Sequence, residues 1–167
     1  MLIDDFSDNN LVSKLGTRWR GVSDKVMGGV SQASLSKITI NERNCLLLTG
    51  DVSLENNGGF IQASLDFKKS GDTLNAASFS GIRLISRGNG EQYSVHLRTP
   101  DNIHPWQSYR IHFISTRDWQ TIDLPFQNFF PHRLDVNLDV SRLRRIGLAA
   151  IGRTFSANLT IAKISFF

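Results

Sequence analysis

Cysteine is almost absent from this chain of 167 residues, in which Cys45 is the only one. An intramolecular disulfide is therefore excluded, and so is a zinc site built from several thiolates. Three leucines follow Cys45 directly. This apolar setting predicts a buried thiol that packs as a small hydrophobe.

Long apolar runs and long basic runs are also lacking. No window approaches the roughly 18 apolar residues of a membrane span, and the first ten residues, MLIDDFSDNN, lack the basic start and apolar core of a secretory signal. We therefore expect no membrane span and a cytoplasmic location. Lys and Arg (19) outnumber Asp and Glu (15), for a formal net charge of +4, but no five basic residues are consecutive. The charge pattern thus predicts no nucleic-acid partner.

Catalytic signatures are missing as well. The chain has no GxSxG elbow, no P-loop and no HExxH pattern. His96 and His112 could meet across a hairpin, but two ligands do not complete a catalytic zinc site. A calcium site assembled from distant loops stays open, although the acidic residues have no calcium-loop spacing. We expect a protein that is not an enzyme and that uses no cofactor and no metal.

Period-two alternation of apolar and polar residues dominates from residue 31 onward, whereas helical spacing is nearly absent. Phenylalanine, which favours strands, is used 11 times. The length fits one domain over residues 1–167, and we predict an all-β jelly-roll sandwich of two antiparallel sheets. Strong strands are expected at 61–67, 81–87, 91–98, 108–114, 119–124, 146–151 and 159–167, weaker ones at 2–6, 32–40 and 45–49, a short helix near 11–15, and a plug of the core at 125–131.

Two stretches read as structured turns. In WRGVSDKVMGGVS, residues 19–31, the pair Gly28 and Gly29 can take positive φ without steric cost, and Asp24 can accept hydrogen bonds from nearby amides. Trp19 and Met27 are expected to be buried beside this turn. The stretch ENNGGF, residues 55–60, repeats the pattern of polar residues, a glycine pair and a large apolar residue.

The hairpin of residues 91–98 and 108–114 offers the candidate binding surface. Tyr93, Val95 and Leu97 point to one side of the first strand, and the other side of the hairpin is polar and basic. On the concave side of a jelly roll this face would suit anionic groups, because guanidinium groups pair with carboxylates and phosphates. The alternative is a solvated outer face with scattered charge. The candidate residues are Arg83, His96, Arg98, Arg110 and His112.

The tryptophans Trp19, Trp106 and Trp119 could form a stacking platform for sugars. Trp106, in the loop sequence HPWQSY, is expected to be exposed, and it joins the candidate binding residues. Trp119 stands in DWQTIDLPF and is expected to lie in the core.

With these motifs in place, the chain resembles the complex I intermediate-associated protein 30 family, in its free-standing bacterial form. The similarity runs nearly end to end and includes the GIR strand at 81–83, the Gly-rich turn before Tyr93, the LPF at 124–126 and the IGL at 146–148. The family motif residues, which we expect to be structural, are Trp19, Asp24, Met27, Gly28, Gly29, Ser31, Asn57, Gly58, Gly59 and Phe60.

The resemblance implies a galactose-binding-like jelly roll and a noncatalytic binding or assembly role. A protein partner is expected, and in this family it would be respiratory complex I (NADH:ubiquinone oxidoreductase) subunits or assembly intermediates. A glycan is the alternative ligand, because family 11 carbohydrate-binding modules share a similar jelly roll. No residue pattern supports an enzymatic function, and a shared fold alone would not be evidence for one.

Overall fold

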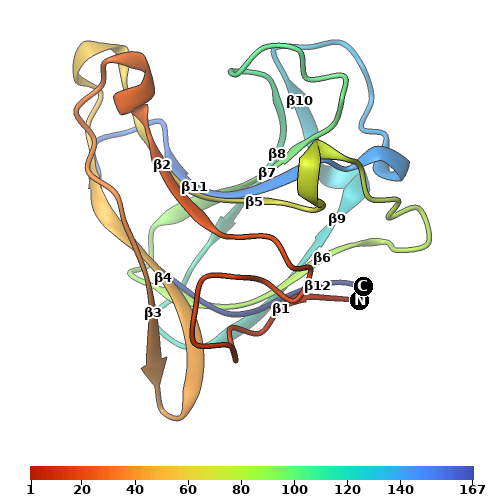
Figure 1. Cartoon of the computed structure of the whole chain (residues 1–167). Coiled ribbons are helices and arrows are strands. Elements are labelled where there is room, and N and C mark those ends of the chain that lie inside the picture. Colours follow the sequence, from red (N-terminus) through yellow and green to blue (C-terminus); the bar gives the residue numbers. More distant parts are fainter.

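The computed structural model describes all 167 residues and arranges the strands in two antiparallel sheets stacked face to face (Figure 1). The first sheet has the strand order β3-β4-β12-β6-β9, and β1 pairs with β12 beside this path. Its strands are β1 (Leu2–Asp4), β3 (Ser34–Ile40), β4 (Arg43–Val52), β6 (Gly81–Gly88), β9 (Gln120–Pro125) and β12 (Phe155–Phe166).

The second sheet has the order β10-β8-β7-β11-β5-β2. Its strands are β2 (Arg20–Ser23), β5 (Phe60–Asp66), β7 (Gln92–Arg98), β8 (Ser108–Ile114), β10 (Phe130–His132) and β11 (Arg145–Ile151). The sandwich of two antiparallel sheets predicted from the alternation is confirmed. β2 and β10 were not predicted, because both are short and β10 contains Pro131, which is confined to sheet edges.

Helical structure is limited to single turns: η1 (Asp24–Met27), η2 (Glu55–Asn57), η3 (Lys69–Gly71), η4 (Phe126–Asn128) and η5 (Val140–Arg142). The predicted plug at 125–131 is confirmed, since Phe126 and Phe129 are buried around η4. The predicted helix near 11–15 is wrong. That segment is a turn, closed by hydrogen bonds from Ser13 N to Thr17 O and from Gly16 N to Ser13 O.

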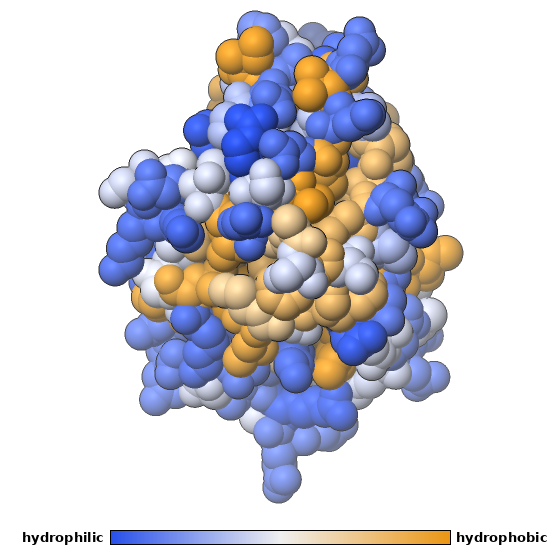
Figure 2. Space-filling view, turned by 90° about the vertical axis from the view of Figure 1, so that its right-hand side faces the viewer, coloured by the Kyte–Doolittle hydropathy of each residue, from blue (hydrophilic) through white to orange (hydrophobic).

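A cluster of 31 buried apolar residues fills the space between the sheets. Tyr93, Val95 and Leu97 of β7 belong to it, which fixes the side of the second sheet that faces the core. At the end of the sandwich near both chain termini, Phe79 and Phe126 pack on Phe166 with ring centroids 5.4 and 6.2 Å apart. Figure 2 shows an apolar area across this side of the molecule.

Cys45 is fully buried, as predicted, and burial raises the pKa of its thiol. The chain contains no helix with the length and apolar character needed to cross a bilayer.

Candidate functional site

The two glycine-rich stretches meet at the carboxylate of Asp24. Asp24 is fully buried, and its oxygens accept hydrogen bonds from Ser31 N at 3.0 Å, from the Ser31 hydroxyl, and from Gly59 N at 2.6 Å. Phe60 N is a more distant donor, at 3.3 Å. One side chain therefore joins residues 24–31 to residues 59–60, which are far apart in the sequence.

The ionised form of Asp24 is favoured by this arrangement. Burial raises the pKa of the carboxyl group, but the hydrogen bonds from Ser31, Gly59 and Phe60 outweigh it and hold the pKa below its ordinary value of 3.8. These hydrogen bonds tie the two glycine-rich stretches together at one buried carboxylate.

The glycines around Asp24 have two different roles. Gly28 ends η1 with φ +84, as the turn prediction requires. At Gly29, a Cβ would lie 2.8 Å from the Asp24 Cβ, and at Gly58 it would lie 2.8 Å from the Asp24 Cγ. These two positions are therefore glycine because the carboxylate passes too close for any side chain.

The large side chains of the motif differ in burial. Trp19 is buried, as expected, and its Nε1 donates to Asp4 Oδ2 at 2.9 Å. The expectation that Met27 is buried is wrong. Met27 is 61% exposed at the tip of η1, because the short 3₁₀ turn carries its side chain away from the core.

The candidate surface is the side of the second sheet that faces away from the core, which we call the β7 face. Strand register brings Phe130, Arg110, His96, Gly147, Ser64 and Arg20 into one row across six strands. The next row contains His112, Ser94, Ala149, Gln62 and Val22. In Figure 1, η1 and η2 lie at one end of this sheet, and β10 with its adjoining loops lies at the other.

The middle of the β7 face carries buried polar groups without hydrogen-bond partners. Ser94 and His96 are buried, and neither Ser94 Oγ nor His96 Nε2 has a partner. Burial, reinforced by the positive charge of Arg110, lowers the pKa of His96 from 6.5 to about 3. His96 is therefore neutral near pH 7 and adds no positive charge to this face.

Arg110 is the cation nearest to His96 across the ladder. Its Nε donates to Ser108 Oγ at 2.8 Å, and burial together with Arg133 lowers the pKa of its guanidinium to about 10. His112 is exposed on the same strand and contacts Phe130 with ring centroids 5.5 Å apart. Phe130 (41% exposed) and Ile114 (54% exposed) add apolar surface at the rim of the face.

Arg98 lies on the β7 face, but its guanidinium is used to hold the loop of residues 99–107. It donates to the carbonyl oxygens of Gln107 at 2.6 Å, Pro105 at 3.0 Å, and Asn102 and His104 at 3.2 Å. The sequence pattern gave no signal of this contact, because carbonyl acceptors are available in any loop.

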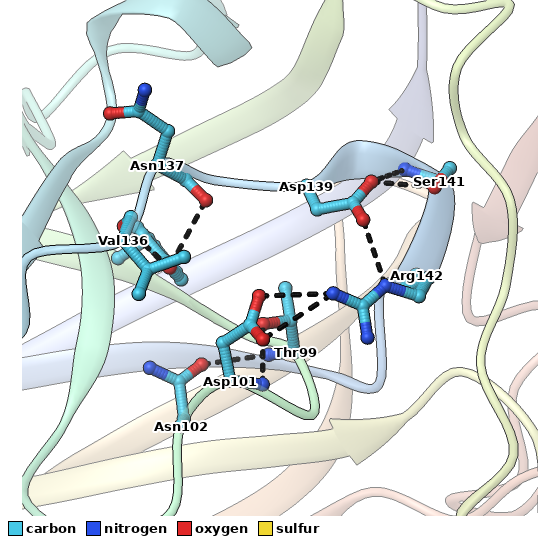
Figure 3. Close-up of polar contacts among 9 residues, drawn as sticks. Thr99, Asp101, Asn102, Val136, Asn137, Asp139, Ser141 and Arg142 are labelled. Carbon is cyan, nitrogen blue, oxygen red and sulfur yellow. Dashed lines mark hydrogen bonds and ion pairs between the residues drawn. The ribbon is translucent and has the colours of Figure 1, made fainter.

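The same loop is tied to the β10–β11 connection, as Figure 3 shows. Arg142 donates to Asp101 Oδ2 at 3.1 Å and to Asp139 Oδ2 at 2.8 Å. Hydrogen bonds from Ser141 and Arg142 lower the pKa of Asp139 to about 2. The rim beside β10 is thereby ordered by charged contacts between its two loops.

Arg83 does not share this face, so its placement with the hairpin residues is corrected. β6 belongs to the first sheet, where Arg83 pairs with Asp123 at 2.6 and 2.8 Å and lies over the Phe167 ring. Alternation along a strand indicates which residues share a side, but it does not reveal which sheet the strand joins.

Among the tryptophans, Trp106 is exposed, as predicted. It is 53% exposed in the 99–107 loop and stacks on His104, with ring centroids 4.5 Å apart and planes 3° from parallel. The placement of Trp119 in the core is wrong. Its ring is half-buried, with the guanidinium groups of Arg43 and Arg87 at 5.1 and 5.8 Å from its centroid.

Gln62 and Gly147 also lie on the β7 face, and the sequence did not indicate either of them. A Cβ at Gly147 would lie 2.6 Å from the Gln62 Cδ, so the glutamine side chain lies across the glycine. The pairing of β5 with β11 creates this contact, and no local pattern encodes that pairing.

The two-sheet architecture is shared with known structures. The family 11 carbohydrate-binding module of the cellulosomal cellulase Lic26A-Cel5E of Clostridium thermocellum aligns with a TM-score of 0.74 and 15% identity, over 100% of this chain and 93% of that one. The same organism's family 11 module in complex with a beta-1,3-1,4-mixed-linked tetrasaccharide gives 0.72 and 15%, over 99% and 94%. Its family 30 module of Cel9D-Cel44B gives 0.69 and 14%, over 99% and 97%. At these identities the likeness establishes the fold, and the predicted jelly roll is confirmed.

Comparison of the sequence with protein families identifies one family. Residues 5–161 match the family model described as Complex I intermediate-associated protein 30 (CIA30). Among curated proteins, no sequence matches the chain.

Proposed function

The chain belongs to the complex I intermediate-associated protein 30 family, and on that premise we propose that it is a noncatalytic binding protein that holds a partner protein on its β7 face. The observation that carries the proposal is the composition of this face. It exposes Phe130, Ile114 and His112, with the half-buried Arg110 beside them. Exposed aromatic and arginine side chains are enriched in protein–protein interfaces.

The family name supplies the class of partner. We propose that the protein acts as an assembly factor and that its partners are respiratory complex I subunits or assembly intermediates. The 99–107 loop beside the β7 face supports this role, because Arg98 and Arg142 hold the loop in place before any partner binds. Such ordering reduces the entropy lost on binding.

The test is affinity capture from the native host with mass spectrometry. The wild-type chain is compared with Ile114→Asp, which places a charge on the exposed rim of the β7 face. Thr39→Asp is the matched control, since Thr39 is exposed on β3 of the other sheet. We expect complex I subunits with the wild type and with Thr39→Asp, and their loss with Ile114→Asp. Capture of the same subunits by all three chains, or of none by any, would refute the proposal.

A glycan is the second candidate ligand, and the stacked pair of Trp106 and His104 favours it. Trp106 is 53% exposed and its ring is held flat against His104, an arrangement that suits stacking on a sugar ring.

The glycan candidate is tested on an array that includes beta-1,3-1,4-mixed-linked glucans. Retention that disappears with Trp106→Ala, in a variant that melts like the wild type, would support it. Absence of any retained glycan, or retention that is unchanged in Trp106→Ala, would exclude this mode of binding.

A further inference from the structure

A second polar site lies at the β2 edge of the same sheet, away from the loops that hold Trp106. It is a pocket of about 330 Å³ formed by the chain before β2 and the chain after β5. No hydrophobic residue lines it. The lining residues are Gly16, Thr17, Arg18, Arg20, Asp66, Lys68, Lys69 and Ser70.

The charge of this pocket is strongly unbalanced. Four cationic side chains face one carboxylate, which leaves a lining charge of +3, against +4 for the whole chain. The carboxylate is already engaged, because Asp66 accepts from Arg145 at 2.6 Å and from Arg20 at 3.4 Å. Arg18, Lys68 and Lys69 make no ion pair and no side-chain hydrogen bond, and all three are exposed. The pocket therefore lacks a counter-ion for three of its four cations.

The backbone holds both walls of the pocket in place. On one wall, Ser13 N donates to Thr17 O at 2.7 Å, and Arg20 pairs with Ser64 in the ladder. On the other, Phe67 N donates to Arg144 O at 2.9 Å, which fixes the chain that leads to Lys68. A Cβ at Gly16 would lie 3.8 Å from the Lys69 Cε, so the lysine stem lies close to this turn.

We propose that this pocket binds a phosphate group. Two guanidinium groups supply directional donors that match tetrahedral oxyanions, and two ammonium groups add charge. The volume accommodates a small phosphorylated molecule. The inference goes beyond the proposed function: of the eight lining residues only Arg20 lies on the β7 face, and it is at the β2 edge, at the opposite end of the row from Phe130.

The test is an NMR titration of backbone amides with inorganic phosphate and, separately, with pyrophosphate, at constant ionic strength maintained with chloride. We expect saturable shifts that are confined to residues 16–20 and 66–71. Arg18→Ala and Lys69→Ala should each weaken binding about tenfold, since a charge-assisted hydrogen bond contributes on that scale. Arg117→Ala and Lys163→Ala are matched controls, exposed and without ion pairs, and should leave the affinity unchanged.

The source of the phosphate is distinguished by vesicles of phosphatidylcholine with and without phosphatidic acid. Binding of pyrophosphate in solution without vesicle binding indicates a soluble phosphorylated ligand, and vesicle binding that needs phosphatidic acid and Arg18 indicates a lipid headgroup. Equal weakening by the control variants, shifts spread over all basic residues, or no saturation with either probe would overturn the proposal. Variants that melt like the wild type exclude misfolding as the cause.

Discussion

Loss of the Asp24 carboxylate is predicted to destabilise the fold, because it leaves buried amides without an acceptor. In Asp24→Ala, Ser31 N and Gly59 N lose their acceptor in a buried environment, whereas the Ser31 hydroxyl keeps Ser53 O at 3.2 Å. An orphaned buried donor costs about 1–3 kcal/mol, so two of them lower the free energy of unfolding by about 2–6 kcal/mol. For a chain of this size, that corresponds to a drop of about 5–20 °C in the melting temperature.

The assay is denaturant unfolding of the wild type, Asp24→Ala and Asp24→Asn, read by circular dichroism. Asp24→Asn retains one acceptor oxygen and should lie between the other two. Asp118→Ala is the control: its side chain is exposed and makes no hydrogen bond, so the change should stay within about 0.5 kcal/mol.

The pH dependence of this difference is a second readout. Because the folded-state pKa of Asp24 lies below 3.8, the stabilisation is complete above pH 3.8 and is lost as the pH falls through the folded pKa. The gap between wild type and Asp24→Ala should therefore narrow at acidic pH. A difference below about 1 kcal/mol at neutral pH, or amides of Ser31 and Gly59 that exchange equally fast in both proteins, would show that the Asp24 hydrogen bonds do not stabilise the fold.

Three further predictions concern other parts of the fold. Gly50→Ala should destabilise the protein by about 3 kcal/mol or more, because a Cβ there would collide with the carbonyl oxygen of Gln32 at a φ of +150; unchanged thermal unfolding would contradict this. Arg98→Ala should lower stability by about 2 kcal/mol and shift the fluorescence of Trp106, because the carbonyls of the 99–107 loop lose their donor; an unaltered spectrum would argue against it. His96, with its folded pKa lowered to about 3, should make stability fall by about 1.4 kcal/mol per pH unit as the pH drops from 6.5 toward 3. His96→Gln should remove that part of the slope, and an identical slope in both proteins would count against a neutral, buried imidazole.

Much of the second sheet was predictable from the sequence. The alternation in β7 and β8 identified the core side with Tyr93, Val95 and Leu97, and the structure buries all three. The motif at residues 19–31 likewise predicted a turn stabilised by Asp24. What the sequence did not reveal was the second half of that contact, since Gly59 N lies 35 residues further along the chain.

The errors have a common physical origin. Arg83 alternates with apolar residues as the polar residues of β7 do, but β6 belongs to the other sheet. The sheet that a strand joins depends on pairing with distant strands, which alternation within one strand does not reveal. Trp119 and Met27 are large and apolar, but neither lies in the core. Trp119 precedes β9 directly and Met27 is the last residue of η1, so both stand in turns at the surface. The phosphate pocket combines Arg18 and Lys69 from segments that no local pattern links.

The proposed binding surface is tested most directly by hydrogen–deuterium exchange on the wild-type chain with and without the subunit captured from its host. We expect added protection in β7, β8, β10 and the 99–107 loop, and none in β3 and β4. Protection confined to β3 and β4, with exchange in β7 and β8 unchanged, would contradict the proposed surface.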